Sequence, residues 1–166
     1  MPMYNKQKGA GLVEVLVALF LLAVTVLGFV ALQLRAFEAT SEGVYRVQAM
    51  NLARDLAERI RANRLNYTVY RTQIETASNQ KDPAKNCYTT LCTTAEMADF
   101  DVSQIRKKAD SLGMTFNFLP CSGTTQRRCI YVAWNETSAT NGTDTTACTN
   151  GNAYRNNSQC VVLETY

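Results

Sequence analysis

The 166 residues include 17 Lys and Arg, 14 Asp and Glu, and no His, which gives a formal net charge of +3. So small a charge argues against a nucleic-acid partner, and the missing His removes the commonest general base and transition-metal ligand. The length suits one folded domain plus an anchor. The sequence contains no nucleophile–base pattern, metal-ligand cluster or Gly-rich phosphate loop, so we expect no enzyme, cofactor or metal.

An uncharged run extends from Val15 to Leu34 and follows a short segment with Lys6 and Lys8. As a helix its roughly twenty residues would span about 30 Å, the thickness of a bilayer's hydrocarbon core. Positive charge stays on the cytoplasmic side, so we expect a single-pass membrane protein whose C-terminal part faces the periplasm. A secretory signal would end in an Ala-x-Ala cleavage site, which this run lacks.

Glu14 stands at the threshold of the apolar run. A carboxylate in hydrocarbon costs about 2.5–3.5 kcal/mol on insertion scales, so it should have a functional partner. If Glu14 instead lies at headgroup depth, the positive end of the helix dipole favours it without a partner. Sequence position alone leaves both interpretations open.

The segment Lys8–Glu14, Lys-Gly-Ala-Gly-Leu-Val-Glu, followed by the apolar run resembles the processing site of type IV pilins, usually Gly-Phe-Thr-Leu-Ile-Glu. The resemblance implies that a prepilin peptidase cuts between Gly9 and Ala10 and removes residues 1–9 as a leader peptide. Ala10 would then be N-methylated. The Glu14 carboxylate would form an assembly salt bridge with the N-terminal amine of a neighbouring subunit. Ala10 and Gly11 depart from the family's usual Phe and Thr.

Residues 10–34 are expected to form the transmembrane and assembly helix, and residues 35–64 its amphipathic continuation. Large apolar residues of the second segment recur at helical spacings and should face a folded domain; they are Phe37, Val44, Leu52, Leu56 and Ile60. Asp55 and Arg59 are spaced as an i,i+4 ion pair in the favourable order.

The stretch from Gln48 to Arg64 resembles the Asp-Leu-Ala-Glu-Arg-Met-Arg-Ala-Asn signature of the PilV family of minor pilins. Its arginines alternate with Asp55 and Glu58, which favours a solvated helix face over a nucleic-acid patch; these arginines are Arg54, Arg59, Arg61 and Arg64.

Residues 65–166 are expected to form a globular periplasmic head. Residues 65–77 read as a weakly amphipathic connection, and Thr93 with Glu96 predicts a capping box for a helix that Gly113 ends. Alternating residues predict strands over 114–120 and 130–134, with a final strand over 160–166. Residues 135–150 are rich in Thr, Asn and Gly, which is typical of a loop.

All six cysteines lie in this head, and an even number in an exported chain predicts three disulfides; they are Cys87, Cys92, Cys121, Cys129, Cys148 and Cys160. Pairing in sequential order is only one of the possible connectivities, and the sequence leaves the choice open.

The resemblance implies an α+β type IV pilin fold: a long N-terminal helix, half transmembrane and half amphipathic, packed on a small disulfide-braced antiparallel sheet domain. It implies a PilV-like minor pilin of the inner membrane and pilus that helps to initiate pilus assembly in a tip priming complex. Implied partners are other minor pilins, the major pilin, a PilY-type tip adhesin, the inner-membrane assembly platform and the prepilin peptidase. The pilus would support twitching motility, adhesion or DNA uptake.

Three alternatives stay open. A type II secretion minor pseudopilin can have a similar leader, although the 56–63 stretch and the cysteine pairs favour the pilus. A membrane-anchored adhesin would keep its leader uncut. A DNA-binding competence pilin would use basic residues of the head; the candidates are Lys107, Lys108, Arg127 and Arg128.

Overall fold

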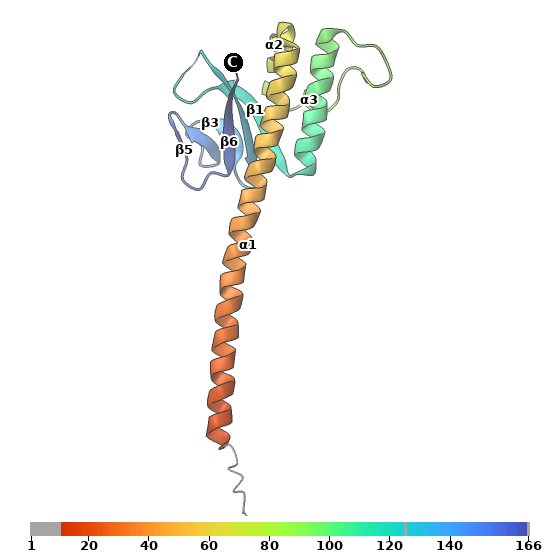
Figure 1. Ribbon diagram of the computed structural model, residues 1–166. Coiled ribbons are helices and arrows are strands. Elements are labelled where there is room, and N and C mark those ends of the chain that lie inside the picture. Colours follow the sequence, from red (N-terminus) through yellow and green to blue (C-terminus); the bar gives the residue numbers. More distant parts are fainter. Residues whose placement is uncertain (1–10, 125, 166) are drawn as a thin grey trace, which may run out of the picture. The chain divides into compact units, whose positions relative to one another are not determined.

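The computed structural model describes residues 11–124 and 126–165. The chain divides into two compact units, Met1–Gly43 and Val44–Tyr166. Helix α1 (Leu12–Ala62) contributes to both, and all other elements belong to the second, which we call the folded unit (Figure 1).

In the first part of α1, residues 12–40 are all exposed among the residues that the structure describes. Its backbone groups are nevertheless satisfied by the helix itself, which is what a hydrocarbon environment requires. Thr25, the one hydroxyl in the apolar run, donates to the Leu22 carbonyl at 2.8 Å. This part of α1 therefore satisfies its backbone hydrogen-bonding groups internally, as a helix that faces lipid must.

The later part of α1 has a buried face, formed by Ala49, Leu52, Ala53, Leu56 and Ile60. The spacing of Phe37 and Val44 predicted that the buried face begins earlier in the helix, but these residues are 74% and 50% exposed. That prediction is wrong because helical spacing identifies an apolar face of the helix but not the residue at which the rest of the chain begins to bury that face. The covering begins near Tyr45, whose ring stacks on Trp134 with centroids 6.4 Å apart.

Two further helices pack in the folded unit. A 3-10 turn η1 (Arg64–Asn66) leads into α2 (Tyr67–Glu75), so the predicted connection contains a helix. Helix α3 (Thr94–Ser111) has the predicted capping box: Thr93 accepts from the Glu96 N–H at 3.3 Å, and the Glu96 carboxylate accepts from the Thr93 N–H at 2.7 Å. Gly113 follows with φ +66°, a left-handed conformation that suits Gly.

The first sheet is antiparallel, with strand order β1 (Met114–Pro120), β2 (Arg128–Trp134), β6 (Cys160–Thr165). The second sheet has the order β3 (Ser138–Asn141), β4 (Ala147–Asn150), β5 (Ala153–Tyr154). It occupies much of the stretch predicted as loop, and its β3–β4 pair is parallel. The antiparallel prediction therefore holds for the first sheet and fails at this one pair.

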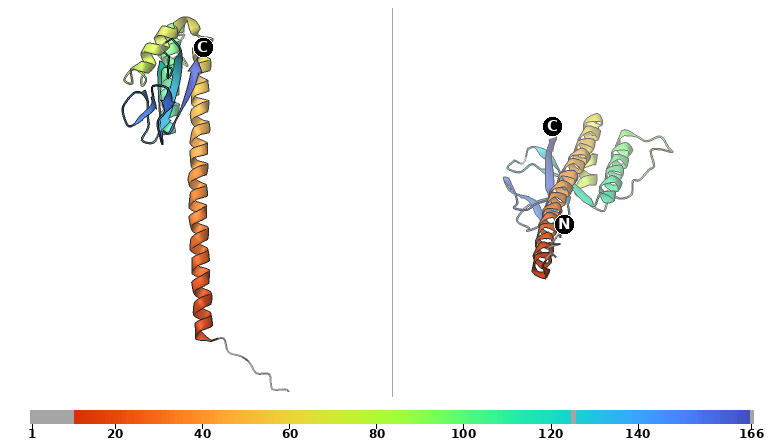
Figure 2. Two further views of the ribbon diagram at one scale, coloured as in Figure 1. Left: turned by 90° about the vertical axis from the view of Figure 1, so that its left-hand side faces the viewer. Right: turned by 60° about the horizontal axis from the view of Figure 1, so that its bottom comes forward.

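The core lies mainly between the helices and the first sheet, and Figure 2 shows the strands beside the later part of α1. Leu56, Ile105 and Phe118 meet in this cluster. The opposite face of β2 meets a second cluster that contains Tyr131 and two disulfides, so β2 is buried on both faces. The cysteines pair in sequential order, as Cys87–Cys92, Cys121–Cys129 and Cys148–Cys160.

Candidate functional site

The apolar segment, which we define as residues 12–34, is the first candidate. Its large side chains are exposed throughout, including Leu12, Phe20 and Leu27. The helix is long and apolar enough to cross a membrane by length and composition. An exposed apolar surface of this extent marks a region that lipid or other protein covers. The first charged residues after it are Arg35 and Glu38, an exposed ion pair at 3.4 Å.

Glu14 is the only acidic residue in the first turn of α1. The Glu14 and Val15 N–H groups both donate to the Gly11 carbonyl, at 2.9 and 3.3 Å. Within residues 11–124 and 126–165, the Glu14 carboxylate has no hydrogen-bond or ion-pair partner. It is therefore available to a cation from outside this part of the chain. The predicted cleavage and methylation positions, Gly9 and Ala10, lie outside the described residues.

A second polar site lies inside the folded unit, where α1, α2 and α3 meet. Arg59 donates to Asp55 at 2.9 Å and to Asp101 of α3 at 2.5 Å. Asp101 also accepts from the Tyr70 hydroxyl of α2 at 2.5 Å. We call these four residues the polar staple. It ties three helices together through one carboxylate whose side chain is only 12% exposed.

The charges of the polar staple are set by their surroundings. Burial would raise the pKa of Asp55, but hydrogen bonds from Arg59 and Lys108 outweigh it and lower that pKa below its usual range. Burial, with the hydrogen bond to Asp101, raises the pKa of Tyr70 far above its ordinary value. Asp55 therefore remains ionised and Tyr70 remains a hydroxyl donor near neutral pH. This arrangement positions helices and offers no nucleophile or proton shuttle.

The polar staple shows what the sequence missed. The Asp55–Arg59 pair is confirmed, and Arg54, Arg61 and Arg64 are exposed as predicted. The solvated-face prediction is wrong for Arg59, which is half-buried between two carboxylates.

Tyr70 and Asp101 were not identified from the sequence. Asp101 did carry a signal, because it lies three residues after Ala98 and four before Ile105 on the apolar stripe of α3. A carboxylate on a buried helix stripe needs a partner.

The basic residues of the DNA-binding alternative do not form one free patch. Arg127 pairs with Glu164 at 2.9 Å and Arg128 with Glu75 at 2.6 Å. Lys108 pairs with Asp55 at 3.1 Å. The charges of Arg127, Arg128 and Lys108 are therefore largely neutralised by carboxylates of the same chain.

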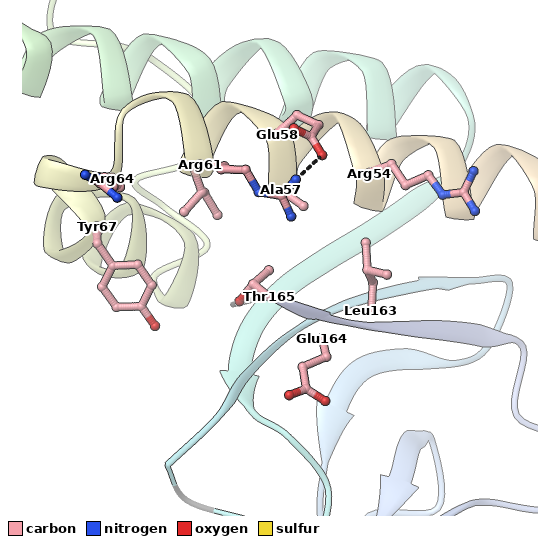
Figure 3. Close-up of a pocket in the computed structure, with 10 residues that line it drawn as sticks. Arg54, Ala57, Glu58, Arg61, Arg64, Tyr67, Leu163, Glu164 and Thr165 are labelled. Carbon is pink, nitrogen blue, oxygen red and sulfur yellow. Dashed lines mark hydrogen bonds and ion pairs between the residues drawn. The ribbon is translucent and has the colours of Figure 1, made fainter.

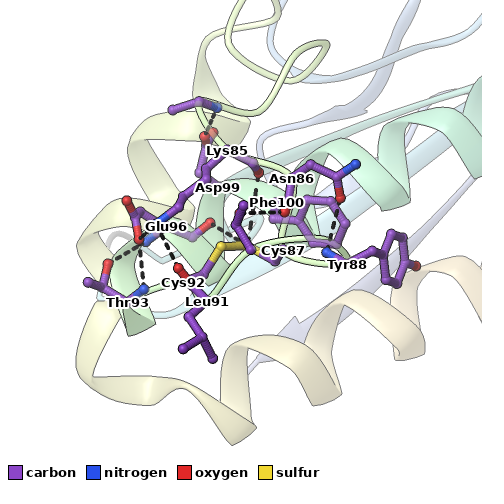
Figure 4. The surroundings of a disulfide bond; sticks show 12 residues. Lys85, Asn86, Cys87, Tyr88, Leu91, Cys92, Thr93, Glu96, Asp99 and Phe100 are labelled. Atoms are coloured by element: carbon purple, nitrogen blue, oxygen red, sulfur yellow. Dashed lines mark hydrogen bonds and ion pairs between the residues drawn. A yellow bond between two sulfur atoms is a disulfide. The ribbon is translucent and has the colours of Figure 1, made fainter.

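The Cys87–Cys92 loop is a third feature, and many contacts fix it (Figure 4). The Asn86 carbonyl accepts from the Thr90 N–H at 3.1 Å, and Lys85 Nζ donates to the Leu91 carbonyl at 2.6 Å. The loop presents an exposed Leu91, but nothing else in it indicates a ligand.

Comparison with known families gives two adjoining matches. The type IV pilin Tt1218 family model matches residues 31–103, and the prokaryotic N-terminal methylation motif matches residues 4–30. The first range contains the whole polar staple, and the second contains Gly9, Ala10 and Glu14. No curated protein and no solved structure matches the chain significantly.

A long N-terminal helix packed on small sheets braced by disulfides is the α+β fold of type IV pilins, a structural and non-enzymatic class. The chain is type IV pilin-like: it is similar to the Tt1218 family over residues 31–103 and to the N-terminal methylation motif over residues 4–30. Its apolar N-terminal helix and that motif are consistent with an inner-membrane pilin, and they imply a prepilin peptidase and pilus machinery.

Proposed function

We propose that the chain is a PilV-like minor pilin that helps to initiate type IV pilus assembly in a priming complex with other minor pilins. The observation that carries this proposal is the apolar segment, which is exposed along its whole length and begins with Glu14, a carboxylate that has no partner among the described residues. The signature-like stretch from Asp55 to Asn63 supports the PilV assignment. It supplies Asp55 and Arg59 to the polar staple, and the Asn63 amide donates to the Thr94 carbonyl at 2.6 Å.

The assembly step follows from electrostatics. The uncut protein resides in the inner membrane, with residues 10–34 in the bilayer and residues 65–166 in the periplasm; residues 35–64 continue the helix into that head. Cleavage after Gly9 removes residues 1–9, liberates the Ala10 amine, which is then methylated, and creates a cation at the helix start. A carboxylate leaving water strongly favours a paired cation and is penalised without one. The amine of one subunit and Glu14 of its neighbour therefore neutralise each other as the helices leave lipid for the filament.

The partners follow from this role. They are the other minor pilins, the major pilin, a PilY-type tip adhesin and the inner-membrane assembly platform. Twitching motility, adhesion or DNA uptake would belong to the assembled pilus. The pairing of Arg127, Arg128 and Lys108 with carboxylates argues against a DNA-binding competence pilin.

Mass spectrometry of the protein from cells with and without prepilin peptidase tests the proposal. We expect an N-terminal methylated Ala10 in the first strain and an intact leader in the second. An uncut N-terminus in both strains would favour the membrane-anchored adhesin. Co-isolation with type II secretion components, and not with pilus components, would favour the pseudopilin alternative.

A further inference from the structure

A groove of about 520 Å³ lies in the folded unit between the end of α1 with η1 and the edge strand β6. Arg54, Arg61 and Arg64 follow one another along the helical wall, and Ile60 and Leu163 contribute apolar surface. Figure 3 shows Leu163 and Thr165 pointing from β6 toward the helix, while Glu164 points to the other side of the sheet. The groove therefore has one wall lined by arginines and an opposite wall formed by strand β6.

Two of these arginines differ from the other arginines of the folded unit. Arg61 pairs with Glu58 at 3.0 Å, whereas Arg54 and Arg64 have no hydrogen-bond or ion-pair partner among the described residues. Elsewhere in the unit, arginines such as Arg71 and Arg106 have carboxylate partners at 3.0 and 2.8 Å. The groove is therefore lined by two arginines whose charge no carboxylate of the described residues neutralises.

The strand that forms the other wall has a free edge. In the described residues β6 pairs with β2 alone. The Trp134 N–H donates to the Gln159 carbonyl at 3.0 Å, and the two-residue alternation of an antiparallel pair then directs the backbone groups of Val162 and Glu164 away from β2. The Val162 N–H donates to the Tyr154 hydroxyl at 3.1 Å, which leaves the edge at Glu164 open in this part of the chain.

A second, smaller groove of about 250 Å³ flanks the same edge on the other side of the sheet. Val162, Tyr154 and Arg127 line it, and Glu164 lines both grooves. A strand that pairs with β6 at Glu164 would send alternate side chains into the two grooves, because successive residues of a strand point to opposite faces.

We propose that this edge receives an extended acidic segment of another protein as an additional strand. From Arg54 to Ala62, where α1 ends just before Arg64, the helix rise is about 12 Å. Three carboxylates at alternate positions of a strand span about 13 Å, which matches this row of guanidinium groups. Main-chain hydrogen bonds to Glu164 supply affinity, and the paired charges supply specificity and register. A nucleic acid would answer the arginines but not the free strand edge. The proposal does not depend on the assembly helix or on the pilus.

Fluorescence anisotropy on the full chain in neutral detergent tests this binding. The probe is a fluorescein-labelled peptide, Thr-Glu-Val-Glu-Val-Glu-Thr, and its control has the same composition with the three glutamates consecutive. We expect the alternating peptide to bind at least about tenfold more tightly. The double variant Arg54→Gln with Arg64→Gln should weaken binding about tenfold or more. The charge-matched variant Lys81→Gln with Lys107→Gln, at exposed positions outside the groove, should stay within about twofold.

Strand addition makes a separate prediction. N-methylation of one alternate set of peptide amides should abolish binding, and methylation of the other set should not, because only one set faces β6. Equal weakening by the two double variants would overturn the proposal, as would equal effects of the two methylation patterns. Tighter binding of a twenty-nucleotide oligothymidylate, lost in the arginine variant, would assign the groove to nucleic acid instead. Unchanged thermal unfolding of each variant excludes loss of fold as the cause.

Discussion

Two carboxylates in this protein have opposite surroundings. Asp101 is nearly buried in the folded unit and accepts from Arg59 and from Tyr70. Glu14 is exposed at the start of the apolar segment and has no partner in the described residues. Asp101 has its hydrogen-bond partners within the chain, so it stabilises the fold. Glu14 can be paired only with a group outside the described residues, as the proposed assembly salt bridge requires.

The apolar side chains repeat the same contrast along one helix. The buried face of α1 at Leu52 and Leu56 packs against other residues of the folded unit, whereas Phe20 and Leu27 are exposed in the part of the chain that the structure describes. Burial of apolar surface contributes about 25 cal/mol per Å² only where a partner removes that surface from water. The folded unit has that partner already, and the apolar segment needs lipid or other subunits.

The largest effect should come from removing the proposed contact between Glu14 and a neighbouring subunit. We expect Glu14→Ala to reduce incorporation into filaments by more than about tenfold, because the neighbouring amine would lose its counter-charge on leaving water. Immunoblots of sheared pili against total cell protein measure this. Glu38→Ala, which removes an exposed carboxylate beyond the apolar segment, is the matched control and should stay within about twofold. Unchanged incorporation of the Glu14→Ala protein would contradict the assembly salt bridge.

The internal contact should instead control stability. We expect Asp101→Ala to lower the free energy of unfolding by about 3–5 kcal/mol, because it leaves Arg59 and Tyr70 without their shared acceptor. Urea unfolding followed by the fluorescence of Trp134, the only Trp, measures the folded unit. Asp110→Ala, which removes an exposed ion pair on the same helix, should cost less than about 1 kcal/mol. Equal losses in the free energy of unfolding for Asp101→Ala and Asp110→Ala would contradict the stabilising role of the polar staple.

The sequence predicted those features whose signals are local. The capping box of Thr93 and Glu96, the pairing of Asp55 with Arg59 and the alternation of β1 depend on residues close together in the chain. The apolar segment was predictable for the same reason, since its length and composition suffice.

The features that were missed depend on contacts between distant residues. Arg59 and Asp101 are 42 residues apart, and Tyr70 and Asp101 are 31 apart. Only the packed helices bring them together, so the position of Asp101 on the apolar stripe of α3 indicated that it needs a partner but not which residues supply one. The parallel β3–β4 pair was missed for a related reason, because its short strands lie in a polar stretch and are stabilised by tertiary pairing and the second cluster.

The smallest effect should appear in the pH dependence of stability. The folded state lowers the pKa of Asp55 below its usual range, since hydrogen bonds from Arg59 and Lys108 outweigh burial. The Asp55 carboxylate therefore stabilises the fold fully above about pH 4 and progressively less as the pH falls through its lowered pKa. We expect Asp55→Asn to cost about 0.5–1 kcal/mol at pH 7, a difference that shrinks toward zero in strong acid.

The chain also offers a matched pair of lysines for this measurement. Lys108→Met removes one of the two cations that hold the Asp55 carboxylate, so it should reduce the acid-dependent loss of stability. Lys107→Met, at the exposed neighbouring position, should leave that loss unchanged. Trp134 fluorescence in urea at several values between pH 7 and strong acid would separate the two. Identical pH profiles for both variants would mean that Arg59 alone holds Asp55, and that α1 and α3 are joined at Asp101 without help from Lys108.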